Sequence, residues 1–201
     1  MVDGFIDKII STQVEKEIIS EQDINIYKYG YVLLYELFVN IVIAVVIGVA
    51  TNRLGELLVF LLLYVPLRSF CGGWHADKLW KCTIYSNLML ILLCVTLSYE
   101  IIYSRTIIMV LIFIIGIIFV GICAPVWTQT KPISSKEKKV YKKRIILIQF
   151  IHCIGICLLL LFGKNKYIYV ITYAYVMQSI LLIVELFATK CRAKWTLEWV
   201  E

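Results

Sequence analysis

Blocks of apolar residues, each long enough to cross a lipid bilayer, alternate along the chain with short polar stretches. Because a membrane-spanning helix needs about 20 mostly apolar residues, each block is predicted to form one transmembrane helix. The blocks cover residues 30–50, 54–70, 83–103, 105–124, 145–163 and 167–188. The pattern therefore predicts an all-α polytopic membrane protein, with a six-span bundle over residues 30–188.

Residues 1–29, ahead of the first block, follow a different pattern. Between residues 2 and 19 the apolar side chains recur at helical spacing, and the charged side chains fall on other faces. This predicts an amphipathic helix on the inner membrane surface. A helix packed on the bundle or on a partner subunit fits the pattern equally well. Residues 189–201 are predicted to form a cytoplasmic tail.

Composition supports the membrane assignment, and charge gives the orientation. Of the 201 residues, 61% are hydrophobic and only 17% are charged, whereas a soluble domain carries about 25% charged residues. On the side of the two termini lie 16 of the 20 lysines and arginines, so the positive-inside rule makes that side cytoplasmic. Orientation in the membrane therefore explains the net charge of +6 without a nucleic-acid partner.

The stretch RSFCGGWHADKLWKC, residues 68–82, joins the second and third blocks on the cytoplasmic side. His75 and Cys82 are a candidate base and nucleophile, because an imidazole can take the proton of a catalytic thiol. On one continuous helix they would stand about 10.5 Å apart, whereas base and nucleophile need about 3 Å. Gly72 and Gly73 permit a sharp bend ahead of His75, and Cys82 is predicted to open the third span.

Two other interpretations of this stretch remain open from spacing alone. The histidine and the cysteine fit an incidental pairing in a polar loop. They also fit a metal site in which Cys71, His75, Cys82 and His152 are the ligands, but no C-x2-C pair supports it. We expect neither a metal nor another cofactor.

Arg68 and the two glycines are candidates for site support. The tetrahedral intermediate of acyl transfer needs hydrogen-bond donors for its oxyanion, and the backbone N–H groups of Gly72 and Gly73 and the Arg68 guanidinium are candidates. Equally, the glycines only make a turn, and Arg68 extends to the lipid headgroups.

Among the polar residues inside the apolar blocks, four in the cytoplasmic half of the predicted bundle are candidates: Glu36, Gln149, His152 and Glu185. Ionisable residues within a membrane are candidates for function, and either glutamate is a candidate to orient His75 or pair with Arg68. Polar contacts between helices explain all four more simply.

A basic stretch precedes the fifth block. Its members are Lys131, Lys136, Lys138, Lys139, Lys142, Lys143 and Arg144. Ser134 and Glu137 have the spacing of a capping box, which favours a helix start over the alternative of a Ser135/Lys138 catalytic pair. The basic face is predicted to attract anionic lipid or an acidic peptide, although the charges equally fit a role in topology alone.

Three sequence features together resemble the AgrB (accessory gene regulator B) family of membrane peptidases. They are the R-S-F-C-G-G-W-H-A block, with six residues between its histidine and Cys82, YKYG at 27–30, and KP at 131–132. The resemblance implies a cysteine endopeptidase that removes the C-terminal part of an AgrD-type propeptide, with His75 and Cys82 as the catalytic pair. It also implies a thioester acyl-enzyme that closes to a cyclic thiolactone or lactone signal for quorum sensing, and a homodimer.

A non-catalytic membrane protein is the rival interpretation. A transporter or exporter of a small peptide or solute would also have six spans and buried carboxylates, and a membrane scaffold or sensor is a third possibility. Transporters more commonly carry paired repeats or helices broken at mid-membrane, and neither feature is found in this sequence.

Overall fold

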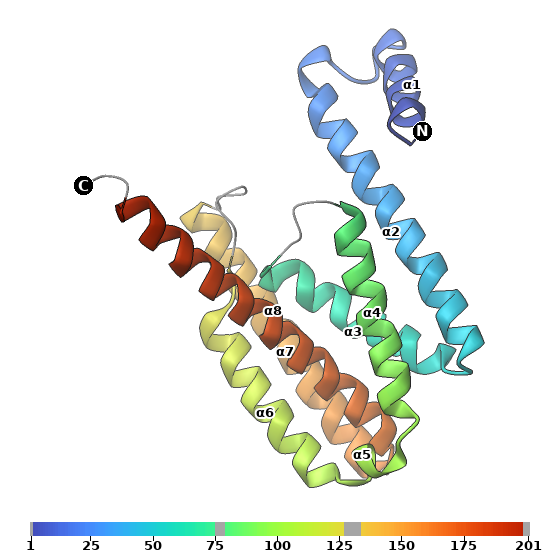
Figure 1. Ribbon diagram of the computed structural model, residues 1–201, viewed down its shortest axis with the longest axis vertical. Coiled ribbons are helices and arrows are strands. Elements are labelled where there is room, and N and C mark those ends of the chain that lie inside the picture. The colour runs from blue at the N-terminus through green and yellow to red at the C-terminus, as the bar shows by residue number, and fades with distance from the viewer. Residues whose placement is uncertain (1, 75–78, 127–133, 199–201) are drawn as a thin grey trace.

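The computed structural model describes residues 2–74, 79–126 and 134–198. In these ranges the regular elements are helices (Figure 1). Their bounds are α1 Val2–Glu15, α2 Ile24–Ala50, α3 Leu54–Cys71, α4 Leu79–Leu97, α5 Glu100–Ser104, α6 Thr106–Cys123, α7 Ser135–Leu161 and α8 Asn165–Glu198, with a 3₁₀ turn at Glu21–Asp23. The predicted all-α class is confirmed.

Helices α2, α3, α4, α6, α7 and α8 are long and apolar enough to cross a membrane, so the prediction of six spans holds in number and order. The predicted boundary at residue 103 is wrong, because α4 ends at Leu97 and the short α5 follows before α6. The chain turns there through backbone hydrogen bonds from Ser98 and Tyr99 to the preceding helical turn. Helix α8 continues past the predicted end at residue 188 as far as Glu198.

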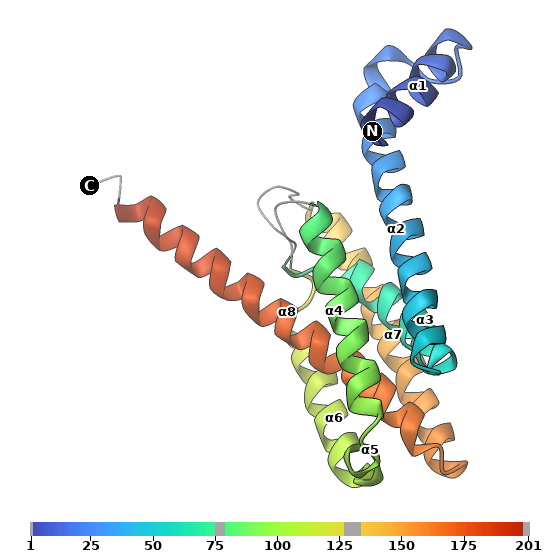
Figure 2. The ribbon, with the colours of Figure 1, turned by 45° about the vertical axis from the view of Figure 1, so that its right-hand side comes forward.

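The ends of the bundle's helices gather at two opposite ends of the molecule (Figures 1 and 2). One end, which we name the Cys82 end, holds the end of α3, the starts of α4 and α7, the end of α6, helix α1 and the end of α8. The opposite end, named the far end, holds the α2–α3 turn, α5 and the α7–α8 turn. The end of α3 and the start of α4, which flank the R-S-F-C-G-G-W-H stretch, therefore lie at the same end of the molecule.

Helix α8 forms the centre of the packing and contacts α3, α4, α5, α6 and α7. Tyr175 on α8 is fully buried, and its ring meets the Phe113 ring edge-on with 5.0 Å between centroids. A Cβ at Gly116 would lie 2.9 Å from the Tyr175 Cβ. The glycine therefore permits the close approach of α6 and α8, as small residues commonly do between membrane helices.

Helix α1 packs against the beginning of α2. Asp7 and Lys28 form an ion pair with 2.6 Å between Oδ1 and Nζ, and the Gln13 amide and the Tyr31 hydroxyl are hydrogen-bonded to each other. Ile6 and Ile10 are buried. These contacts agree with the interpretation of a helix packed on the bundle, and its position on the membrane surface stays a prediction.

Candidate functional site

The bend predicted between α3 and α4 is present. Helix α3 ends at Cys71, and Gly72 and Gly73 follow with φ of 67° and 107°, a region that L side chains rarely adopt. A Cβ at Gly73 would also lie 2.8 Å from Nη1 of Arg68 and 3.2 Å from the Leu181 carbonyl oxygen. Glycine is thus required at position 73 by both conformation and space. We name residues 71–74 the glycine turn.

The segment that follows α6 holds one side of the glycine turn. The Val126 N–H donates to the Cys71 carbonyl at 3.0 Å, and the Gly73 N–H donates to the Val126 carbonyl at 3.0 Å. These two bonds form a short parallel bridge around Gly72. The turn is therefore fixed to a segment more than fifty residues away in sequence.

Helix α8 holds the other side of the glycine turn. The Trp74 N–H donates to the Leu181 carbonyl at 3.1 Å, and the buried Gln178 amide donates to the Gly72 carbonyl at 3.0 Å. Each bond satisfies a backbone group that a turn leaves without a helical partner. The backbone at Trp74, which leads directly into His75, is thereby anchored to the most buried helix of the bundle.

Arg68 braces the glycine turn from within α3. Its guanidinium donates to the carbonyl oxygens of Gly72 and Trp74. The Gly72 N–H donates to the Arg68 carbonyl, and the Gly73 N–H is bonded to Val126. An oxyanion role for either glycine N–H would therefore require an existing backbone bond to break, whereas a role in shaping the turn requires no change.

Cys82 is the fourth residue of α4 and is half-buried. The Ser86 side chain interacts with its thiol, and electrostatic interactions link the thiol to Glu36 on α2 and to Arg68. The Trp74 ring meets the Tyr85 ring edge-on at 5.3 Å, which ties the glycine turn to the beginning of α4. The structure thus brings Glu36, Arg68 and the glycine turn to Cys82, while His75 lies outside the described residues.

A layer of polar side chains continues from Cys82 between α2 and α4. The Asn40 amide donates to the Glu36 carbonyl at 2.9 Å, and the Asn87 amide donates to the Thr83 carbonyl at 2.8 Å and to Asn40 Oδ1 at 3.4 Å. Oε1 of Glu36 and Oδ1 of Asn87 are buried without a hydrogen-bond partner. We name Glu36, Asn40 and Asn87 the α2–α4 polar layer.

Sequence reasoning singled out Glu36 but missed Asn40 and Asn87. The signal was present, since an asparagine inside an apolar span is costly unless it finds a partner. What the sequence did not reveal is that α2 and α4, which are not consecutive spans, pack side by side. Only that packing puts the two asparagines at one depth with Glu36.

Of the other predicted polar residues of the spans, Gln149 and His152 join neighbouring helices, and Glu185 bonds within its own helix. Gln149 donates to the Ile117 carbonyl at 2.9 Å and joins α7 to α6. His152 and the Tyr175 hydroxyl are 3.0 Å apart and join α7 to α8. Glu185, on α8, accepts from the Thr189 hydroxyl at 3.3 Å. The contacts of Gln149 and His152 agree with the simpler explanation of polar contacts between helices, and His152 has a partner other than a metal.

The basic stretch begins α7, and the predicted capping box of Ser134 and Glu137 is present. Lys142 donates to the carbonyls of Gly121 and Ala124 at the end of α6. Arg144 lies over the Phe70 ring at 5.0 Å from its centroid. The other described lysines of the stretch, Lys136, Lys138, Lys139 and Lys143, are exposed, and Lys131 lies outside the described residues.

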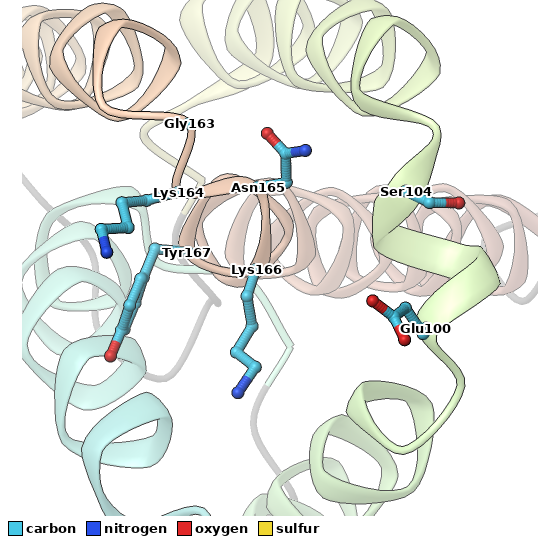
Figure 3. A pocket seen from close by; sticks show the side chains of 7 residues that line it. All are labelled: Glu100, Ser104, Gly163, Lys164, Asn165, Lys166 and Tyr167. Atoms are coloured by element: carbon cyan, nitrogen blue, oxygen red, sulfur yellow. The ribbon is translucent and has the colours of Figure 1, made fainter.

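Two further features do not join the site. Cys71 is fully buried, and among the residues that the structure describes, no group of three or more His, Cys, Asp or Glu side chains is arranged to hold a metal. A pocket of about 450 Å³ lies at the far end and is lined by residues of α5 and of the α7–α8 turn, including Glu100, Lys164 and Lys166 (Figure 3). It is on the opposite end of the bundle from Cys82 (Figure 1).

Comparison with known proteins identifies the family. The AgrB family, described as accessory gene regulator B, matches residues 4–182. The chain is 29% identical over 150 residues to the "Putative AgrB-like protein" of Clostridium perfringens strain SM101, covering 69% of this chain and 68% of the relative. It is 24% identical over 159 residues to "Protein FsrB" of Enterococcus faecalis strain OG1RF, covering 78% and 63%. No solved structure matches. The chain, with its six apolar helices and its braced glycine turn, belongs to the AgrB family of quorum-sensing membrane proteins.

Proposed function

We propose that this chain is a membrane-embedded cysteine endopeptidase that cuts an AgrD-type propeptide and closes the retained part into a thiolactone or lactone ring. One observation carries the proposal: the glycine turn is anchored on both sides, and its last residue, Trp74, packs against Tyr85, three residues from Cys82. His75 is the residue that follows Trp74. The residue directly before the candidate base is therefore held in place, and its ring packs against a residue close in sequence to the candidate nucleophile.

The first step is acyl transfer to the enzyme. His75 takes the proton of the Cys82 thiol, the sulfur attacks the scissile carbonyl, and a C–S bond forms. The C–N bond then breaks, and the proton passes from His75 to the leaving amine. The products are a thioester on Cys82 and the released C-terminal part of the propeptide.

The second step closes the ring. An internal cysteine or serine of the retained peptide gives its proton to His75 and attacks the thioester carbonyl. The C–S bond to Cys82 breaks, and the Cys82 sulfur regains a proton from His75. Water would divert this thioester to a linear peptide, so a half-buried nucleophile between membrane helices favours ring closure.

Arg68 serves this chemistry as a positioning residue in the proposal. Its bonds to the carbonyls of Gly72 and Trp74 hold the turn that leads to His75. Its positive charge also interacts electrostatically with Cys82. The exposed lysines at the start of α7 supply a basic surface at the same end for anionic lipid or an acidic propeptide segment. We further propose a homodimer in the bacterial cell membrane.

Covalent trapping tests the proposed function. The probe is a synthetic propeptide, taken from a short reading frame beside the gene with an amphipathic start, a central cysteine or serine and an acidic end. We expect mass spectrometry of the quenched enzyme to find the N-terminal peptide fragment attached to Cys82, because the thioester precedes ring closure. Attachment at another residue, Ser135 for example, would overturn the mechanism.

Cysteine labelling tests the proposed orientation. In a cysteine-free variant, a cysteine introduced at Ser104, exposed at the far end, is expected to react with an impermeant maleimide in intact cells. A cysteine introduced at Lys139, exposed at the Cys82 end, is the matched control and should react only after permeabilisation. The reason is the excess of lysine and arginine at the Cys82 end. The reverse labelling pattern would place Cys82 on the outer side.

A further inference from the structure

The α2–α4 polar layer has the chemistry of a peptide subsite. We infer that Glu36 and Asn87 bind backbone N–H groups of the acyl segment that Cys82 carries, and thereby hold that segment while its ring closes. The inference rests on the proposed function and adds to it a specific place for the retained part of the propeptide.

The hydrogen-bonding state of the layer indicates the type of occupant. The amide nitrogens of Asn40 and Asn87 already donate hydrogen bonds, Asn40 to the Glu36 carbonyl and Asn87 to the Thr83 carbonyl and Asn40 Oδ1. Two buried oxygen atoms of the layer have no hydrogen-bond partner, the acceptors Glu36 Oε1 and Asn87 Oδ1. Buried polar groups in proteins are nearly always paired, and hydrocarbon offers them no partner. An occupant must therefore supply N–H or O–H donors, and a peptide backbone supplies them at every residue except proline.

The distance from Cys82 to the α2–α4 polar layer matches the length of a short peptide segment. Asn87 follows Cys82 by five residues on α4, so it lies about 7.5 Å further along the helix. An extended peptide covers about 3.3 Å per residue. A segment joined to Cys82 through its terminal carbonyl therefore spans the distance to Asn87 with two or three residues. Glu36 faces the same interface from α2 and interacts electrostatically with Cys82.

The position of the layer favours the acyl segment over the released part. The α2–α4 polar layer lies on the side of Cys82 that leads into the bundle, because α4 runs from the Cys82 end toward the far end. The exposed lysines at the start of α7 are at the Cys82 end. The part that leaves goes toward those polar surroundings, and the acyl segment stays among the helices, where water is scarce.

The test measures how the acyl-enzyme divides between ring and linear product. With the synthetic propeptide described above, we expect Asn87→Leu to lower the ratio of cyclic to linear peptide about tenfold, which is the effect of one lost hydrogen bond. Glu36→Leu should lower the ratio as well, and Glu36→Gln, which retains an acceptor, should restore part of what Glu36→Leu loses. Thr96→Val on the same helix, whose hydroxyl bonds carbonyls of its own helix, is the control and should keep the wild-type ratio.

Changing the peptide instead of the enzyme protects the test from misfolded variants. Single N-methylation removes one N–H at a time from the propeptide. With wild-type enzyme, methylation two or three residues before the cut should lower the ratio, and in Asn87→Leu it should have little further effect. Ratios unchanged by Asn87→Leu, Glu36→Leu and every N-methyl group would overturn the subsite. Failure of the proposed function would appear differently, as release of the C-terminal part that survives Cys82→Ser.

Discussion

Cys82→Ser is expected to reduce release of the propeptide's C-terminal part by about 10³-fold or more, as loss of a covalent nucleophile does in other proteases. A serine hydroxyl at this position fits the space, but it is far less acidic than a thiol and ionises much less readily. His75→Ala should cause a loss of similar size, because the two side chains act as one unit and their effects do not add. Release is measured with propeptide and enzyme in lipid vesicles.

Other cysteines provide the control. Cys123 at the end of α6 is half-buried like Cys82, and Cys123→Ser should process the propeptide within about twofold of wild type, as expected for a site outside the chemistry. Each variant is first checked for membrane insertion. If Cys82→Ser or His75→Ala inserts and still releases the peptide at the wild-type rate, the catalytic pair is wrong.

Gly73→Ala is expected to slow processing by about 100-fold, the effect of displacing a catalytic group by about 1 Å. At φ of 107° an alanine is strained, and its Cβ would lie 2.8 Å from Nη1 of Arg68 and 3.2 Å from the Leu181 carbonyl oxygen. Relief of this crowding moves the glycine turn away from α8 and carries Trp74 and His75 with it. Initial rates with the same propeptide measure the change.

Gly55→Ala is the matched control, because it makes the same change in α3 where a Cβ would meet only the Tyr167 hydroxyl, at 3.9 Å. It should process the propeptide within about twofold of wild type. Equal rates for Gly73→Ala and wild type would show that the turn adjusts without disturbing the site. The braced geometry would then have no bearing on catalysis.

Sequence reasoning predicted the helices and the bend because both depend on local properties. Apolar blocks of spanning length predict membrane helices, and a pair of glycines ahead of His75 predicts a break between helices. The capping box at Ser134 is equally local, since it needs only the Glu137 side chain three residues later. The end of α4 was misplaced because the polar interruption at residues 98–100 is only three residues long and Ile101 and Ile102 follow it, so hydropathy averaged over a span does not reveal the turn.

The contacts that build the site depend on residues far apart in sequence, and for that reason one sequence did not reveal them. Val126 and Leu181 bond the glycine turn through backbone groups. Such bonds do not require a particular side chain, so the residue type at these positions does not indicate them. Arg68 was considered as an oxyanion donor or a headgroup ligand, whereas its guanidinium bonds two carbonyls of its own turn. Asn40 and Asn87 can be assigned to one polar layer with Glu36 only once α2 and α4 are known to be neighbours.

The anchoring of the glycine turn bears on how the motif can be inherited. Its acceptors at Val126 and Leu181 come from the segment after α6 and from the last helix. A truncated gene product that keeps the R-S-F-C-G-G-W-H block but stops before residue 181 carries the recognisable signature without the acceptor for the Trp74 N–H. An intact motif in a shortened homologue is therefore poor evidence for an active enzyme, and the integrity of the C-terminal helix is the better criterion when related genomes are surveyed.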